Sequence, residues 1–263
     1  MDGRCCNSSC GASCDFCDLT GLEGTCSTAP LGRTPSPSCP GGYACSGGSQ
    51  SCVSTCNTDA GCVAARCGTG GVCIPKVSTL KEDFNSGGFD ASVWVAVSAN
   101  CSVVNQQFQV VTQAGPANYF QIVAARRYDL LNSDLRIELA DPGNQSLATM
   151  EALANVCDYT NSNRCISLLA NSNEVIIELN NMGAYSNLTG PFPMANLRRY
   201  RMREQSGTLF LDVQNDAGTY VTLGSGPTPF GSLLNDTTVS IGAGTYNAEA
   251  ATSTVIWDNV NTP

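Results

Sequence analysis

Side chains that could do chemistry gather in the second half of the chain, around three arginines. Arg199, Arg201 and Arg203 alternate with non-basic residues, which is the period of two expected of a strand with two different faces. The surrounding stretch, residues 197–223, continues this alternation and contains two turn sequences with glycine. It therefore predicts three consecutive antiparallel strands joined by tight turns.

Other charged residues in alternating contexts could join two of these arginines on one sheet face. Together with an adjacent tyrosine, the candidate ligand-binding residues are Arg136, Glu138, Glu178, Arg201, Arg203, Asp212 and Tyr200. Bidentate arginine and carboxylate groups match sugar hydroxyls, and Tyr119, Tyr128, Tyr200 or Tyr246 could stack on sugar rings. The alternative is a solvated sheet face with cross-strand ion pairs, each of which stabilises little. Both interpretations stay open.

The chain contains no histidine. This excludes histidine-based catalytic triads, histidine metal sites and histidine pH switches. A zinc site is also disfavoured, because only Cys14 and Cys17 have finger-like spacing and no second such pair exists.

Cysteines are distributed unevenly. Thirteen of the 16 lie before residue 74, in a segment too poor in large apolar residues to build a core, so disulfides are expected to hold it. Such density favours a secreted or cell-surface protein. Cys157 and Cys165 are spaced to close a hairpin, which leaves Cys101 to pair with the N-terminal module; an intermolecular bond is the alternative.

Charge and hydropathy limit the partners. The net charge is −9 and the pI about 4.4, which argues against binding to nucleic acid. No apolar run approaches the roughly 20 residues of a transmembrane helix, and the first residues lack the features of a signal peptide. No transmembrane segment is expected.

The cysteine boundary predicts a disulfide-rich module over 1–76, a linker over 77–80 and a second domain over 81–263. Short alternating or apolar runs, separated by Gly, Asn, Ser or Pro, fill the second domain, and no segment has a capped helical period. The predicted fold class is all-β, an antiparallel sandwich or barrel.

The two ends of the second domain carry a family resemblance. Glu82-Asp83-Phe84-Asn85 and the closing Trp257-Asp258-Asn259-Val260, with the strand and turn sequences at 201–207 and 215–220, resemble the concanavalin A-like lectin/glucanase superfamily. The resemblance implies a jelly roll of two curved antiparallel sheets, with any ligand on the concave sheet. The spacing of cysteines at 5–75 resembles modules of secreted proteins from myxobacteria and related bacteria.

The resemblance also raises the questions of catalysis and metal binding. Retaining glycosidases of this superfamily carry a Glu-x-Asp-x-(x)-Glu pattern, with carboxylates about 5 Å apart, and this pattern is missing. Glu174 and Glu178 lie about 13 Å apart along a strand, so no enzyme activity is expected. Asp83 and Asp258 could share a structural Ca²⁺ between the terminal strands; no other cofactor is expected.

Two functions are therefore expected. The first is a non-catalytic extracellular glycan-binding or adhesive protein, whose partner is a polysaccharide or cell-surface glycan. The alternative is a structural subunit that assembles with copies of itself into a filament or coat. A glycoside hydrolase is the third and least favoured interpretation.

Overall fold

The computed structural model describes residues 6–96, 98–171, 174–194 and 198–262. It divides into two compact units, Met1–Pro75 and Lys76–Pro263. No helix in the described part of the chain has the length and apolar character that spanning a membrane requires.

The first unit is held by disulfides, because its regular structure is minimal. It contains β1 (Asp15–Phe16), β2 (Ser27–Thr28), η1 (Pro40–Gly42), η2 (Asp59–Gly61), β3 (Ala65–Gly68) and β4 (Val72–Pro75). Six disulfides link Cys6–Cys17, Cys10–Cys26, Cys14–Cys45, Cys39–Cys52, Cys56–Cys67 and Cys62–Cys73. Cross-links of this density replace the apolar core that so short a segment cannot build.

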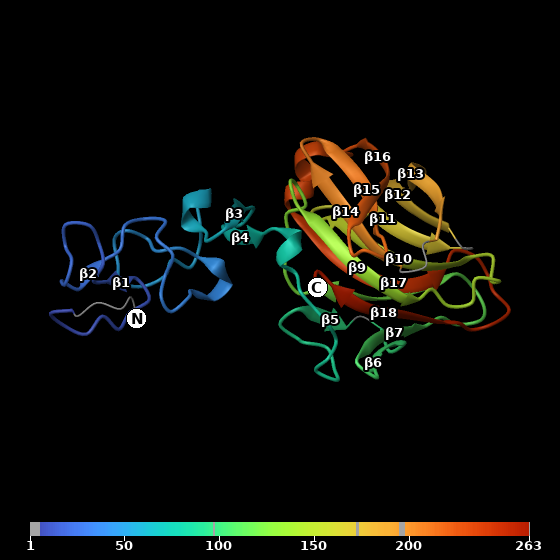
Figure 1. Cartoon of the computed structure of the whole chain (residues 1–263), viewed down its shortest axis with the longest axis horizontal. Helices are drawn as coiled ribbons and strands as arrows, with labels where there is room; N and C mark the ends of the chain where they lie inside the picture. The colour runs from blue at the N-terminus through green and yellow to red at the C-terminus, as the bar shows by residue number, and fades with distance from the viewer. Residues whose placement is uncertain (1–5, 97, 172–173, 195–197, 263) are drawn as a thin grey trace. The chain divides into compact units, whose positions relative to one another are not determined.

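The second unit is a jelly roll of two seven-stranded antiparallel sheets, as the sequence predicts (Figure 1). Sheet 1 has the strand order β13-β12-β11-β10-β17-β8-β5. Its strands are β5 (Trp94–Ala96), β8 (Asn118–Ala124), β10 (Met150–Asp158), β11 (Arg164–Asn171), β12 (Glu174–Asn181), β13 (Ala184–Pro193) and β17 (Thr237–Thr245).

Sheet 2 has the order β16-β15-β14-β9-β18-β7-β6. Its strands are β6 (Cys101–Val104), β7 (Gln107–Val111), β9 (Asp134–Asp141), β14 (Arg199–Gln205), β15 (Thr208–Gln214), β16 (Tyr220–Pro227) and β18 (Thr254–Val260). The 3₁₀ helices η3 (Val77–Thr79) and η4 (Gly231–Asn235) complete the unit. The stretch that predicts three strands forms β14, β15 and β16; its first residue, Leu197, lies outside the described residues.

The core lies between the two sheets. Alternate residues of each strand point into it, among them Trp94, Trp257 and Tyr200, none more than 2 % exposed. Because side chains alternate along a strand, the residues between them face outward. Each sheet thus has an outer face, and the charged candidate ligand-binding residues lie on these two faces.

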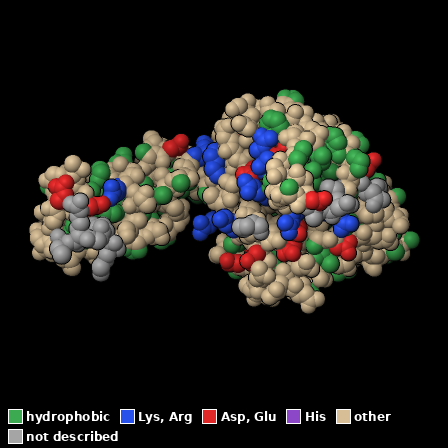
Figure 2. All heavy atoms as spheres, viewed as in Figure 1, with side chains coloured by type: hydrophobic (Ala, Val, Ile, Leu, Met, Phe, Trp, Pro, Cys, Tyr) green, Lys and Arg blue, Asp and Glu red, His purple; other side chains and the backbone are tan. Residues whose placement is uncertain are grey.

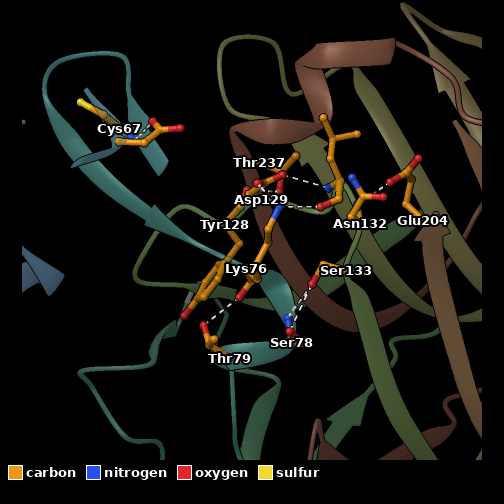
Figure 3. Close-up of polar contacts among 12 residues, drawn as sticks. Cys67, Lys76, Ser78, Thr79, Tyr128, Asp129, Asn132, Ser133, Glu204 and Thr237 are labelled. Carbon is orange, nitrogen blue, oxygen red and sulfur yellow. Dashed lines mark hydrogen bonds and ion pairs between the residues drawn. The ribbon is translucent and has the colours of Figure 1, made fainter. Parts of the chain in front are cut away.

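The start of the second unit is fixed by polar contacts (Figure 3). Lys76 Nζ lies 2.6 Å from Asp129 Oδ2 and donates to the carbonyl of Leu131, also at 2.6 Å. Val77 and Leu80 are buried in the core. Two apolar side chains of the expected linker over 77–80 thus pack in the core of the second unit.

Candidate functional site

The outer face of sheet 1 carries an arrangement of acidic, aromatic and apolar side chains. On β10, Ala152, Ala154 and Val156 belong to the core, so Glu151 and Leu153 face outward. Leu153 pairs with Leu169, and Leu169 with Ile176. These three form a buried cluster separate from the main core, which makes the outer face of sheet 1 partly apolar.

Tyr119 reaches Glu151 across an intervening strand. In the register of sheet 1, Gly244 of β17 lies between Tyr119 of β8 and Glu151 of β10. A Cβ at position 244 would lie 2.3 Å from the Tyr119 ring, so only glycine leaves room for the ring to cross. The Tyr119 hydroxyl donates a 2.8 Å hydrogen bond to Glu151 Oε2. Glycine at 244 therefore positions this pair.

The pKa of Glu151 is raised. Burial is the largest cause, and hydrogen bonds from Tyr119 and Asn171 oppose it by stabilising the carboxylate. The pKa of Tyr119 is also raised, first by burial and then by the negative charge of Glu151. Tyr119 consequently keeps its proton and remains the donor to Glu151.

Glu178 is the second acid on this face. It lies on β12, paired with Ser167, which in turn pairs with Asn155 of β10. Its pKa is raised, first by burial and then by the charge of Glu151. The two glutamates are therefore electrostatically coupled, and across the described residues no arginine or lysine forms an ion pair with either.

The outer face of sheet 2 is different, because its acids are paired with arginines. Arg201 Nη2 lies 2.7 Å and Arg203 Nε 3.0 Å from Asp212 Oδ2, and Thr222 donates to Oδ1 at 2.7 Å. The Asp212 side chain is fully buried. Burial alone would raise its pKa, but the hydrogen bonds from Arg203, Thr222 and Arg201 hold that pKa below its ordinary value.

A second group of charges lies beside this network. Arg136 Nε contacts Asp134 Oδ2 at 2.5 Å, and Arg199 Nε contacts Glu138 Oε2 at 3.0 Å. Figure 2 shows blue arginine and lysine side chains with red carboxylates among them over β9 and β14. A pocket of about 70 Å³ opens here and is lined by Arg136, Glu138 and Arg199.

The structure brings together most, but not all, of the predicted ligand-binding residues. Arg136, Glu138, Arg201, Arg203 and Asp212 share the outer face of sheet 2. Two assignments need correction. Tyr200 is 0 % exposed because it alternates with the arginines and points into the core. Glu178 lies on sheet 1, since β12 pairs with β11 and not with the arginine strands.

Sequence reasoning missed Glu151 as a site residue. It lies near the start of β10, next to outward apolar residues, so the strand gives no polar alternation. The signal that could have identified it is Gly242-Ala243-Gly244 within β17, where glycine in a strand marks a close approach by another group. Tyr119, expected only as a stacking residue, is the group that approaches.

The proposed calcium ligands lie near one another. The pKa of Asp258 is raised by burial and, among further causes, by the charges of Glu138 and Asp83. Glu82 Oε2 is buried without a hydrogen-bond partner among the described residues, beside Asp83 in a pocket. No three carboxylate-bearing side chains of the described residues converge tightly enough to form a metal site by themselves, so a Ca²⁺ here would need backbone or water oxygens.

The cysteines outside the first unit behave in two ways. Cys157 and Cys165 form the disulfide that their spacing predicts, between paired positions of β10 and β11. Cys101 is a buried free thiol in the described structure, and burial raises its pKa to about 11. The predicted bond from Cys101 to the N-terminal module is therefore not formed here; Cys5 lies outside the described residues.

Comparison with known proteins found similar structures. No protein-family model and no curated protein matches the chain. A Bacteroides ovatus GH16 protein from a mixed-linkage glucan locus has a TM-score of 0.49 at 10 % identity, covering 68 % of this chain and 98 % of its own. A structure described under endo-acting O-glycanases of the human gut microbiota has a TM-score of 0.48 at 8 % identity, covering 68 % of this chain and 97 % of its own. A laminarinase from Flavobacterium sp. UMI-01 has a TM-score of 0.47 at 9 % identity, covering 68 % of this chain and 97 % of its own.

None of these TM-scores reaches 0.5, so the jelly-roll fold rests on the strand order of this chain's own two sheets. The named structures are those of glycan-cleaving enzymes, which contradicts the prediction of a non-catalytic glycan-binding, adhesive or structural protein. Because the single-strand carboxylate pattern is missing, hydrolase activity would have to use carboxylates from different strands. Glu151 and Glu178 belong to two strands and interact electrostatically across sheet 1.

Proposed function

We propose that the second unit is an enzyme that cleaves or transfers glycosidic bonds, with Glu151 and Glu178 as its two carboxyl groups. The observation that carries this proposal is that both lie on the outer face of sheet 1, where Tyr119 donates a 2.8 Å hydrogen bond to Glu151 and, among the described residues, no arginine or lysine forms an ion pair with either glutamate. Both pKa values are raised in addition. Glycoside hydrolysis uses two carboxyl groups of different protonation, one as a general acid and one as a nucleophile or base.

The surroundings favour one assignment of roles. Glu151 accepts a hydrogen bond from Tyr119, which stabilises its ionised form, so Glu151 acts as nucleophile or base. The charge of Glu151 then favours the protonated form of Glu178, so Glu178 acts as the general acid. The buried Leu153, Leu169 and Ile176 cluster makes the surroundings of the two acids partly apolar.

The test is an assay for cleavage of soluble β-glucans, both mixed-linkage and β-1,3-linked. Cleavage is measured as the release of reducing ends. Glu151→Gln and Glu178→Gln should each lower kcat about 100-fold or more, because acid–base catalysis contributes about 10²–10⁴. Glu174→Gln is the matched control: it lies on the same strand and is exposed, and it should retain activity. Wild-type activity in either variant, or no cleavage of any glucan or mucin-type glycan by the native protein, would contradict the proposal.

We also propose that the protein is secreted. The six disulfides of the first unit support this, since such bonds persist in oxidising compartments. The proposal also rests on the resemblance of that unit to modules of myxobacterial secreted proteins. Mass spectrometry of culture supernatant from the producing cells, compared with their lysate, tests it.

A structural Ca²⁺ held by Asp83 and Asp258 is a further part of the proposal. It is supported by the electrostatic interaction of the two carboxylates and by the unsatisfied Glu82 oxygen nearby. Ca²⁺ at 100 times its Kd would stabilise the fold by about 2.7 kcal/mol. Chelator should therefore lower the Tm of the wild type but not of Asp83→Asn/Asp258→Asn, and an unchanged wild-type Tm would contradict the site.

A further inference from the structure

The pocket on the outer face of sheet 2 holds polar groups that the fold leaves unused. Arg136 uses Nε to contact Asp134, and no partner is found for its terminal nitrogens among the described residues. Glu138 accepts from Arg199 and Asn259 through Oε2, while its Oε1 is unused within the same part of the chain. Tyr220 also lines this pocket.

These groups form a mixed set of donors and acceptors around an aromatic wall. The guanidinium carbon of Arg136 lies 5.7 Å, and that of Arg201 4.5 Å, from the centre of the Tyr220 ring. On the opposite side the carboxylate of Glu138 is held by the amide of Asn259 at 2.9 Å. The pocket is thus built by the strands β9, β14, β15, β16 and β18, all within sheet 2, and by residues that follow β18.

The charges of the pocket select the chemical class of its ligand. An anion would meet the carboxylate of Glu138, with that of Asp134 next to it, and a cation would meet the guanidinium groups of Arg136 and Arg199. A hydroxyl group both donates and accepts, so neighbouring hydroxyls can bridge Arg136 and Glu138 together. A neutral, polyhydroxylated ligand fits this arrangement best.

The size of the pocket limits the ligand to a single ring. A volume of about 70 Å³ has room for roughly five water molecules. That is far below the roughly 300–1,000 Å³ of sites that enclose a drug-sized ligand. A terminal or protruding sugar residue can place its hydroxyls here with one face against Tyr220.

We propose that this pocket is a second glycan-binding site, which holds one neutral sugar residue and lies on the opposite sheet from Glu151 and Glu178. It would keep the protein on a polysaccharide while the other sheet acts on the chain. That role rests on the proposed enzyme activity, whereas sugar binding in the pocket requires neither Glu151 nor Glu178.

The test observes the arginine side chains directly. In the ¹⁵N-labelled full chain, the Nε–H signals of Arg136 and Arg199 are followed by NMR during titration with methyl β-D-glucoside, methyl β-D-galactoside and methyl α-D-mannoside. At least one glycoside should shift both signals with a Kd in the millimolar range, about −4 kcal/mol. Sodium glucuronate, which carries the same hydroxyls with an added charge, should bind at least tenfold more weakly than the corresponding neutral sugar.

Substitutions then assign the effect to the pocket. Tyr220→Ala and Arg136→Gln should each weaken the affinity for that glycoside at least tenfold. Arg126→Gln, an exposed arginine outside the pocket, should leave the affinity unchanged. The proposal is overturned if no glycoside moves the two signals, or if only glucuronate does, which would identify an anion site. Loss of catalysis in Glu151→Gln leaves this titration unchanged, so the two proposals fail independently.

Discussion

The outer faces of the two sheets shift the pKa values of their acidic side chains in opposite directions. On sheet 2, Asp212 is fully buried but paired with Arg201 and Arg203, and its pKa is lowered. On sheet 1, Glu151 and Glu178 are partly buried, face one another's charge without an arginine, and have raised pKa values. The first arrangement stabilises the ionised form of an acid, and the second favours the protonated form. The two faces of one jelly roll thus shift the pKa values of their acids in opposite directions.

The largest expected effect comes from removing the cations of sheet 2. In Arg201→Met/Arg203→Met, Asp212 would be left buried without a counter-charge, which costs about 3–5 kcal/mol. Urea unfolding at neutral pH measures this loss. The triple variant Arg201→Met/Asp212→Leu/Arg203→Met removes the charge as well and should recover most of the stability. A double variant as stable as the wild type would mean that the arginines do not support Asp212.

A smaller effect concerns how the free energy of unfolding depends on pH. The acids of the two faces should change it with opposite sign. The lowered pKa of Asp212 contributes stability that is present above its unfolded pKa and is lost as pH falls through the folded value. Raised pKa values act in the opposite sense, since ionised Glu151 and Glu178 disfavour the folded state above their folded pKa. Asp212→Asn should therefore destabilise the protein near pH 7, and Glu178→Gln should stabilise it or leave it unchanged.

Thermal unfolding between pH 3 and pH 8 measures both variants against the wild type. The two differences should shrink as the acids become protonated at low pH. The comparison fails if Glu178→Gln is the less stable of the two variants at pH 7, because that would mean that Glu178 is a stabilising charge.

The smallest expected change concerns the hydroxyl of Tyr119. Tyr119→Phe removes the hydrogen bond that stabilises the Glu151 carboxylate, so the pKa of Glu151 should rise further. The acidic limb of the kcat/KM profile, which requires ionised Glu151, should then move to higher pH. The ring itself remains over Gly244, so stability should change little. An unshifted acidic limb would show that Tyr119 does not tune Glu151.

Much of the fold follows from the sequence because strand alternation is local. The period of two at Arg199 to Arg203 predicts β14, and the turn at Gly207 places β15 beside it. Alternation does not identify β13, since Gly190, Pro191 and Pro193 are unusual in a strand; at the sheet edge they are tolerated. The coupling of Glu151 with Glu178 could not be predicted, because it depends on which strands become neighbours in sheet 1.

On sheet 2, too, the sequence does not show which side chains contact one another. The sequence identifies Arg201, Arg203 and Asp212 as residues of one polar face, but it does not show that they neutralise one another. In the structure, Arg201 and Arg203 form ion pairs with Asp212, so these charges form a structural network. The less conspicuous Arg136 and Glu138 remain with unused groups.

The most direct test is an NMR titration of the glutamate side-chain carboxyl carbons, comparing the wild type with Glu151→Gln. The pKa of Glu178 should lie above that of an ordinary glutamate in the wild type. It should fall in Glu151→Gln, because the neighbouring charge is gone while burial remains. An ordinary pKa for Glu178 in the wild type, or one that does not respond to Glu151→Gln, would contradict the coupled pair on which the proposed chemistry depends.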